Sequence, residues 1–127
     1  MIVLDTSVAI AALTGHRAAR EAVAGQRLVA PHLIDVEVAH ALRGLVIEGR
    51  IAVADADRVL DVWERLAIDR VAMAPLVRRI WELKQNLTAY DAAFVATAEA
   101  HGVALLTADR RLAAAAGPRC AIQLIPL

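Results

Sequence analysis

Short apolar runs alternate with longer segments of helical periodicity along the chain. The runs contain mostly Val, Ile, Leu and Ala, which is typical of buried strands, and they occupy 2–4, 28–30, 71–73, 103–106 and 121–125. Apolar residues at helical spacing predict helices over 6–13, 16–24, 34–48, 55–66, 75–84, 89–101 and 110–116. Because parallel strands are joined by helical crossovers, this alternation predicts a three-layer α/β/α fold with a central, mainly parallel sheet of four to five short strands.

Residues that begin or end helices support these boundaries. Gly49 and Gly102 follow two of the helical segments, where glycine adopts the left-handed conformation that ends a helix. Thr88 can cap the helix that starts at residue 89, and Pro75 suits a first helical turn. The chain has no internal repeat and no long linker, so we expect residues 1–127 to form a single domain.

The composition limits the kinds of protein that this chain can be. Hydrophobic residues make up 59% of the sequence and aromatic residues only 3%, so the core has to be built from small and aliphatic side chains. No apolar run approaches the roughly 20 residues of a membrane span, and the N-terminus lacks a signal-peptide pattern, so we expect a soluble, cytoplasmic protein. The single cysteine, Cys120, cannot form an internal disulfide. The 14 basic and 14 acidic residues balance, which by itself does not favour nucleic-acid binding.

Four acidic residues lie where the predicted fold would bring them together. Asp5 and Asp109 each follow a strand, whereas Glu37 and Asp91 begin helices. The carboxyl ends of parallel strands and the starts of the following helices face the same rim of the sheet. Carboxylates gathered there repel one another unless a hard divalent cation compensates their charge. The pattern therefore predicts a Mg²⁺ or Mn²⁺ site, which is suited to hydrolysing a phosphodiester bond.

Each of these acids also has a purely structural interpretation. Asp5 and Asp109 could cap the helices that follow them, and Thr88-x-x-Asp91 resembles a capping box. Glu37 and Asp35 both lie in a first helical turn, where the helix dipole favours acidic side chains, so position does not distinguish them. The four candidate acids differ from ordinary caps because each lies beside an apolar run, and a half-buried carboxylate needs a compensating partner.

Four sequence motifs, in this order, resemble those of the PIN-domain nucleases and, within them, the VapC-type toxins of bacterial toxin–antitoxin pairs. They are Ile2-Val3-Leu4-Asp5-Thr6-Ser7, Ala30-Pro31 with Glu37-Val38-Ala39-His40-Ala41-Leu42-Arg43, Tyr90-Asp91-Ala92-Ala93-Phe94-Val95-Ala96, and Leu105-Leu106-Thr107-Ala108-Asp109-Arg110-Arg111-Leu112. The resemblance covers essentially the whole chain. It implies a PIN-like fold and a Mg²⁺- or Mn²⁺-dependent endoribonuclease that acts on structured RNA of translation, such as tRNA or rRNA.

The same resemblance implies roles for particular residues and partners. Thr6 and Thr107 match neighbours that orient the metal-binding, catalytic acids, which are matched by Asp5, Glu37, Asp91 and Asp109. A homodimer is implied, together with a VapB-like antitoxin that threads a segment into the site and blocks it. His40 departs from the family, in which many members carry Asn at this position, and we interpret it as a polar filler.

Three arginines are predicted to contact the RNA backbone. Arg43 lies further along the helix that holds Glu37, and Arg110 and Arg111 follow Asp109 directly. For Arg110 and Arg111, solvated surface arginine is an equally good interpretation.

The helix predicted over 55–66 and the tryptophans are expected to serve packing. The buried stripe of that helix is predicted to consist of Val59, Leu60, Val62, Trp63 and Leu66. Trp63, Trp81 and Val62 are expected in the core or in a dimer interface, rather than as platforms on which nucleobases stack.

Other classes of protein fit the pattern less well. A receiver-like signalling domain needs an adjacent acidic pair after the first strand and a late lysine, but Asp5 is followed by Thr6-Ser7 and the only lysine is Lys84. A nucleotide-binding module would need a glycine-rich phosphate loop, which the sequence lacks. A catalytically inactive PIN-like domain that binds RNA or a partner remains the alternative.

Overall fold

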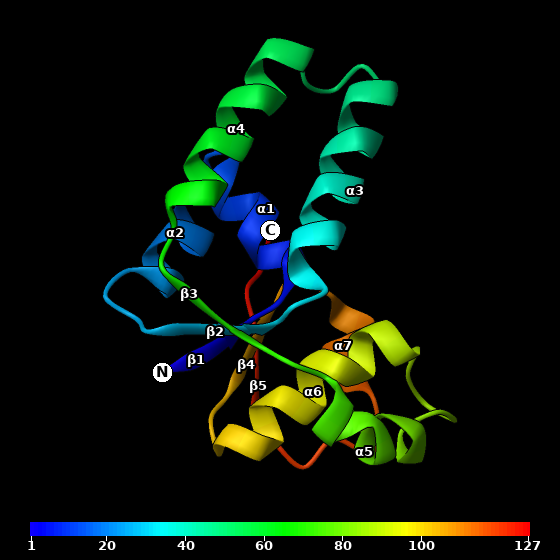
Figure 1. The fold of residues 1–127 in the computed structure, drawn as a ribbon. Coiled ribbons are helices and arrows are strands. Elements are labelled where there is room, and N and C mark those ends of the chain that lie inside the picture. The colour runs from blue at the N-terminus through cyan, green and yellow to red at the C-terminus, as the bar shows by residue number, and fades with distance from the viewer.

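The computed structural model describes residues 1–127 and has a sheet of five strands at its centre (Figure 1). The order across the sheet is β3-β2-β1-β4-β5. The strands are β1 (Ile2–Leu4), β2 (Leu28–Pro31), β3 (Ile68–Val71), β4 (Leu105–Thr107) and β5 (Ile122–Leu124). All four strand pairs are parallel, so the predicted sheet is confirmed.

The strand order has a switch point between β1 and β4. The chain builds the sheet outward from β1 through β2 to β3, and then returns to the other side of β1 with β4 and β5. Val3 is consequently paired with Val29 on one side and with Leu105 on the other. In open parallel sheets, the helices that follow strands on opposite sides of a switch point leave a crevice at the carboxyl ends of those strands. The residues just after β1 and β4 therefore lie where this fold class binds ligands.

Helices cover both faces of the sheet. They are α1 (Thr6–Leu13), α2 (Arg17–Val23), α3 (Ile34–Ile47), α4 (Val53–Arg65), α5 (Val77–Glu82), α6 (Ala89–His101) and α7 (Arg110–Ala114), with a short 3-10 turn at Ala74–Leu76. Figure 1 shows α1 to α4 on one side of the sheet and α5 and α6 on the other, which confirms the three-layer architecture. None of the helices has the combined length and apolar character of a membrane span.

Helix α6 lies in the most enclosed part of the core. Every residue from Ala92 to Ala98 is buried, and four of these seven residues are alanine. Small side chains let the helix approach β1 and β2 closely, and Phe94 fills the remaining space as the largest fully buried side chain. The predicted ends of this helix are confirmed, because the Thr88 hydroxyl accepts from the Asp91 N–H at 3.2 Å and Gly102 has a φ of 63°.

The third strand lies three residues before its predicted position. The segment 71–73 was expected because it is apolar, but β3 runs over Ile68–Val71 and includes Asp69 and Arg70. Only Ile68 in this strand is buried, since β3 is an edge strand. Asp69 forms an ion pair with Arg27 at 2.8 Å. An edge strand with polar partners does not need a continuous apolar run, so the apolar pattern pointed to the wrong residues.

Helix α4 starts two residues earlier than predicted and buries a narrower stripe. Trp63 is buried, as predicted, but Val62 and Leu66 are exposed, so the expected five-residue stripe is wrong at these two positions. Trp81 on α5 is also exposed, and packing in the core is therefore wrong for Trp81 as well. Helix α4 buries only Ala56 and Trp63, and α5 buries none of its residues, so both helices leave apolar side chains exposed.

Candidate active site

Asp5 directly follows β1 at the switch point and is almost fully buried, with 6% of its surface exposed. It occupies the N-cap position of α1, yet its side chain makes no capping hydrogen bond. One carboxylate oxygen, Oδ2, accepts hydrogen bonds from the Ser7 hydroxyl at 2.6 Å and from the Thr107 hydroxyl at 2.7 Å. The structure thus excludes the interpretation of Asp5 as a helix cap, and its other oxygen, Oδ1, has no donor from the protein.

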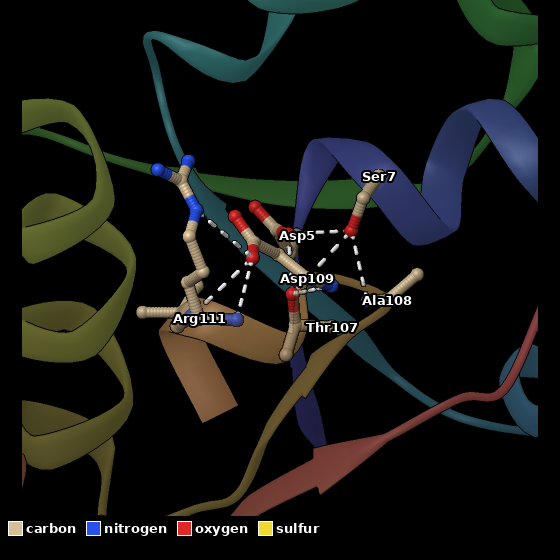
Figure 2. A network of polar contacts seen from close by, with 7 residues as sticks. Asp5, Ser7, Thr107, Ala108, Asp109 and Arg111 are labelled. Carbon is tan, nitrogen blue, oxygen red and sulfur yellow. Dashed lines mark hydrogen bonds and ion pairs between the residues drawn. The ribbon is translucent and has the colours of Figure 1, made fainter. Parts of the chain in front are cut away.

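The hydroxyls of Ser7 and Thr107 connect the ends of β1 and β4. Ser7 donates to Asp5 and accepts from the Ala108 N–H at 2.9 Å, whereas Thr107 donates to Asp5 and accepts from the Asp109 N–H at 3.1 Å. Figure 2 shows this network at the start of α1. Each hydroxyl has one proton, which both give to Asp5, so the carboxylate is fixed in position by two short hydrogen bonds.

Asp109 follows β4 and serves as a genuine N-cap of α7. Its Oδ1 accepts from the backbone N–H groups of Arg111 at 2.8 Å and Leu112 at 3.4 Å. The Arg111 guanidinium lies 4.0 Å from the same oxygen and is almost fully exposed, so it contributes little. The capping interpretation is therefore correct for Asp109, but it uses only one of the two oxygens. Oδ2 has no hydrogen-bond donor in the protein.

Glu37 lies in the first turn of α3. The Thr6 hydroxyl donates to its Oε1 at 3.2 Å, so Thr6, which was predicted to orient the acids, contacts Glu37. Its Oε2 has no donor from the protein. In Asp5, Glu37 and Asp109 alike, one oxygen is held by the protein while the other is left unpaired.

Asp91 lies close enough to the other three acids for their negative charges to influence one another's pKa values. Burial raises the pKa of Asp91 above its ordinary value of 3.8, and the negative charges of Asp5 and Asp109 raise it further. Burial also raises the pKa of Glu37 above its ordinary value of 4.5, against the Thr6 hydrogen bond, and the charges of Asp5 and Asp91 add to this rise. Four acids from four separate segments therefore repel one another across one rim of the sheet. We call Asp5, Glu37, Asp91 and Asp109 the acidic rim.

The acidic rim provides donors suited to a hard divalent cation, although its carboxylates do not form a closed cage. No three His, Cys, Asp or Glu side chains lie close enough together to surround an ion by themselves. Mg²⁺ commonly binds through only one or two carboxylates and retains several water molecules, so a closed protein cage is not required. The unpaired oxygens and the two raised pKa values are what is expected of carboxylates that lack a compensating charge.

Two of the predicted RNA-contacting arginines, Arg110 and Arg111, directly follow Asp109 of the acidic rim, whereas Arg43 lies six residues after Glu37 on α3. Arg43 and Arg110 are exposed and make no hydrogen bond or ion pair, and Arg111 extends into solvent beyond Asp109. His40 is exposed and lines a surface hollow together with Glu37. The interpretation of His40 as a polar filler stays a prediction, but its place beside Glu37 leaves it free to contact a substrate.

Two residues at the site were not singled out from the sequence. Ser7 has the shortest hydrogen bond to Asp5, and Tyr90 lines the hollow that contains Glu37. Ser7 could have been found from the adjacent hydroxyls of Asp5-Thr6-Ser7, because two successive residues of a first helical turn can reach different neighbours. No pattern in the sequence distinguishes the exposed Tyr90 from a buried aromatic residue.

Comparison with models of known protein families identifies the family to which this chain belongs. The model of the PIN domain matches residues 2–118, which is nearly the whole chain. This chain belongs to the PIN-domain family. Among curated relatives of this PIN domain, ribonuclease VapC9 of Mycobacterium tuberculosis is 47% identical over 126 residues, covering 99% of each chain. Ribonuclease VapC1 of the same organism is 41% identical over 128 residues, covering 97% of this chain and 96% of that protein. The resemblance to VapC-type PIN domains in the four motifs is thereby confirmed.

Solved structures support the same PIN-domain fold. A toxin–antitoxin complex from Klebsiella pneumoniae matches with a TM-score of 0.72 and 18% identity, covering 99% of this chain and 98% of that chain. The VapBC2 structure from Rickettsia felis, bound to a DNA fragment from its promoter, matches with a TM-score of 0.69 and 13% identity, covering 98% of both chains. At this level of identity the likeness concerns the fold alone.

Proposed function

We propose that this PIN domain is the Mg²⁺-dependent endoribonuclease toxin of a toxin–antitoxin pair, and that it hydrolyses phosphodiester bonds in structured RNA of translation, such as tRNA or rRNA. The observation that carries the proposal is the acidic rim, in which four carboxylates from four segments lie near enough at the switch point of the sheet to raise the pKa values of Glu37 and Asp91. Curated relatives that are 47% identical and are named as VapC ribonucleases support the same activity.

The residues of the acidic rim would hold the cation, which is Mg²⁺ or Mn²⁺ in this proposal. A bound divalent cation lowers the pKa of water and offsets negative charge on a phosphate, which are the two requirements of phosphodiester hydrolysis. The hydroxyls of Thr6, Ser7 and Thr107 each hold one oxygen of Glu37 or Asp5, and the other oxygen of each carboxylate would be available to the cation. Such supporting hydrogen bonds orient metal ligands and raise their affinity for the ion.

The exposed arginines near the rim supply positive charge for the substrate. Arg43, Arg110 and Arg111 are not neutralised by strong ion pairs, and an RNA backbone would provide their counter-charges. These contacts position the RNA without reading its sequence. The uncompensated arginines and the metal-bearing rim together explain how a chain with balanced overall charge could bind a polyanion.

An antitoxin and a second copy of the chain are the protein partners in this proposal. Structures of similar fold are toxin–antitoxin complexes, which supports a VapB-like partner. Co-expression with a small antitoxin from the neighbouring gene should relieve growth arrest caused by this chain, and arrest that the neighbour does not relieve would contradict this assignment. Light scattering of the purified protein tests the predicted homodimer.

The decisive experiment incubates the purified protein with total tRNA and rRNA in Mg²⁺, in Mn²⁺ and in EDTA, with Asp5→Asn as the inactive control. We expect discrete internal cleavage in either metal and none in EDTA or with Asp5→Asn. Sequencing the new RNA ends would then identify the target. Tight binding of RNA without cleavage in any metal would instead support the inactive, RNA-binding alternative.

A further inference from the structure

Two of the four aromatic side chains in this protein lie on the surface, in neighbouring segments. Trp63 and Phe94 are buried, whereas Trp81 on α5 is 62% exposed and Tyr90 on α6 is 66% exposed. Trp81 and Tyr90 have no role in the core, and the proposed function does not use them. Large aromatic side chains at this exposure commonly mark a binding surface.

The two exposed aromatic residues line adjoining hollows. Trp81 lines a hollow of about 660 Å³ between α5 and the start of α6, and Ala89 forms part of its wall. Tyr90 lines a second hollow, of about 380 Å³, in which Glu37 of the acidic rim is also a wall residue. Ala89 and Tyr90 are consecutive residues, so each hollow has a wall residue in the first turn of α6. Trp81 thus lies in a hollow on one side of this turn, and Tyr90 shares the other hollow with Glu37 of the acidic rim.

Positive charge accompanies the aromatic residues. The Lys84 ammonium lies 4.8 Å from the centre of the Trp81 ring, and Arg78 lines the same hollow. Neither Lys84 nor Arg78 forms an ion pair within the protein. Surfaces that bind single-stranded nucleic acid combine these two features, because the cations contact phosphates while the rings stack on bases.

A rigid support holds Trp81 outward. Arg79 of α5 binds Glu99 of α6 through two hydrogen bonds, Nε to Oε1 at 2.7 Å and a terminal nitrogen to Oε2 at 3.1 Å. Leu83, four residues after Arg79, is buried. Since Arg79 and Leu83 anchor one face of the segment, Trp81 is kept on the opposite face. A platform fixed in this way loses little conformational entropy when a base stacks on it.

We propose that Trp81, Lys84 and Tyr90 form a stacking track that binds an unpaired stretch of RNA and leads it to the acidic rim. This proposal rests on the proposed function and adds to it a binding site for unpaired bases next to the acidic rim. Bases in a duplex already stack on one another and cannot place their faces on Trp81 or Tyr90, whereas bases in loops can.

The test measures binding of a short single-stranded uridine RNA in EDTA, where no cleavage occurs. The chain has two tryptophans, and Trp63 is only 4% exposed, so a change of fluorescence on adding RNA reports Trp81. We expect the RNA to quench the wild-type protein, and a duplex of the same length to leave its fluorescence unchanged. Trp81→Phe should keep the affinity but lose the quenching, because phenylalanine still stacks.

Variants separate stacking from charge. Trp81→Ala and Tyr90→Ala should each weaken binding of fluorescein-labelled RNA about tenfold, as expected for the loss of one stacked base. Lys84→Gln should reduce the dependence of affinity on salt. Ile47→Ala, which removes an exposed apolar side chain at the far end of α3, is the matched control and should bind like the wild type. Circular dichroism checks that each variant is folded, and Tyr90→Ala tests the same track if Trp81→Ala is not.

Three results would overturn the stacking track. They are unchanged fluorescence on adding RNA, wild-type affinity in both alanine variants, and conversion of a dimer to a monomer by Trp81→Ala, which would assign this face to a second copy of the chain. Failure of the proposed function would be distinguishable, because it is measured as Mg²⁺-dependent cleavage by the wild type. If the wild type cleaves RNA but its Trp81 does not respond, the track alone is wrong.

Discussion

Asp35 and Glu37 lie two residues apart in the first turn of α3, in surroundings that differ in almost every respect. Asp35 accepts a hydrogen bond from the Trp63 indole at 2.8 Å and two from the Arg70 guanidinium, at 2.6 and 2.8 Å. Glu37 has only the Thr6 hydroxyl and faces other carboxylates. Hydrogen bonding from Arg70 lowers the pKa of Asp35, whereas burial beside negative charges raises the pKa of Glu37.

This difference distinguishes a carboxylate that serves the fold from one available for chemistry. The Asp35 carboxylate already has its compensating charge, and it joins α3 to α4 through Trp63 and to the edge strand β3 through Arg70. The acidic rim has no positive side chain nearby except the exposed Arg111, so most of the compensating charge would have to come from an ion in solution. Since carboxylates with raised pKa values cluster at functional sites, we propose that Glu37, and not Asp35, takes part in the chemistry.

The largest expected effect is on RNA cleavage, when Glu37 and Asp35 are each replaced by the neutral amide. Glu37→Gln should reduce Mg²⁺-dependent RNA cleavage by at least about 100-fold, because it removes a charge that the cation needs. Asp35→Asn, with the same chemical change two residues away, should retain cleavage within a few-fold of the wild type. Rates are measured on one labelled RNA at saturating Mg²⁺. Equal losses in both variants would remove the distinction between the two acids.

Removal of the Ser7 hydroxyl should have an intermediate effect. Ser7→Ala deletes the hydrogen bond to Asp5 at 2.6 Å and should lower cleavage about tenfold, with a higher Mg²⁺ concentration needed for half-maximal rate. Thr14→Val is the control, since it deletes a hydroxyl that bonds only to backbone carbonyls of α1. A Ser7→Ala variant with unchanged Mg²⁺ dependence would show that the hydroxyl does not orient Asp5.

For the free energy of unfolding, in contrast to cleavage, Asp35→Asn should have the larger effect and Glu37→Gln the smaller. Asp35→Asn should lower the free energy of unfolding by about 1 kcal/mol, a modest loss because the Asp35 side chain is 42% exposed and solvent screens its ion pair with Arg70. Without Mg²⁺, Glu37→Gln should be as stable as the wild type or more stable, because it relieves repulsion in the acidic rim. Urea unfolding of both variants in EDTA makes the comparison, and a less stable Glu37→Gln protein would argue against that repulsion.

The smallest effect concerns pH. A carboxylate whose pKa is raised on folding binds protons more tightly in the folded state. The ionised Glu37 therefore lowers the free energy of unfolding of the metal-free protein at neutral pH. This loss of stability disappears as pH falls through the raised pKa of Glu37 toward its ordinary value of 4.5. Asp35 has a lowered pKa, so its stabilising contribution is complete above 3.8 and is lost as pH falls through the lower folded value. The stability difference between wild type and Glu37→Gln should therefore narrow as the solution is acidified, whereas one that widens would contradict the raised pKa.

Much of the fold follows from the sequence because burial leaves a clear pattern. β1, β2 and α6 are enclosed by the core, so continuous apolar residues mark them, and local signals at Thr88 and Gly102 mark the ends of α6. The edge strand β3 gives no such signal, since its polar residues Asp69 and Arg70 are paired with side chains from distant segments. Pairing of this kind depends on the finished fold.

The candidate site was predictable in outline for the same reason. The position of Asp5 and Asp109 after strands fixes them at the rim, because the order of parallel strands places those ends side by side. The sequence could not show which acids already have partners. Asp35 and Glu37 look equivalent until Arg70, which lies 35 residues after Asp35, is seen to bind only one of them. It also could not show that Trp81 is exposed, since an aromatic residue at helical spacing resembles a core position.

Thermal unfolding with and without Mg²⁺ tests most directly whether the acidic rim holds a cation. A ligand that binds only the folded state raises the melting temperature, and the rise grows with the logarithm of the ratio of ligand concentration to Kd. We predict that Mg²⁺ raises the melting temperature of the wild type and of Asp35→Asn, and that Glu37→Gln and Asp5→Asn lose most of this rise. An equal rise in all four proteins, or none in the wild type at concentrations that support cleavage, would contradict cation binding by the acidic rim.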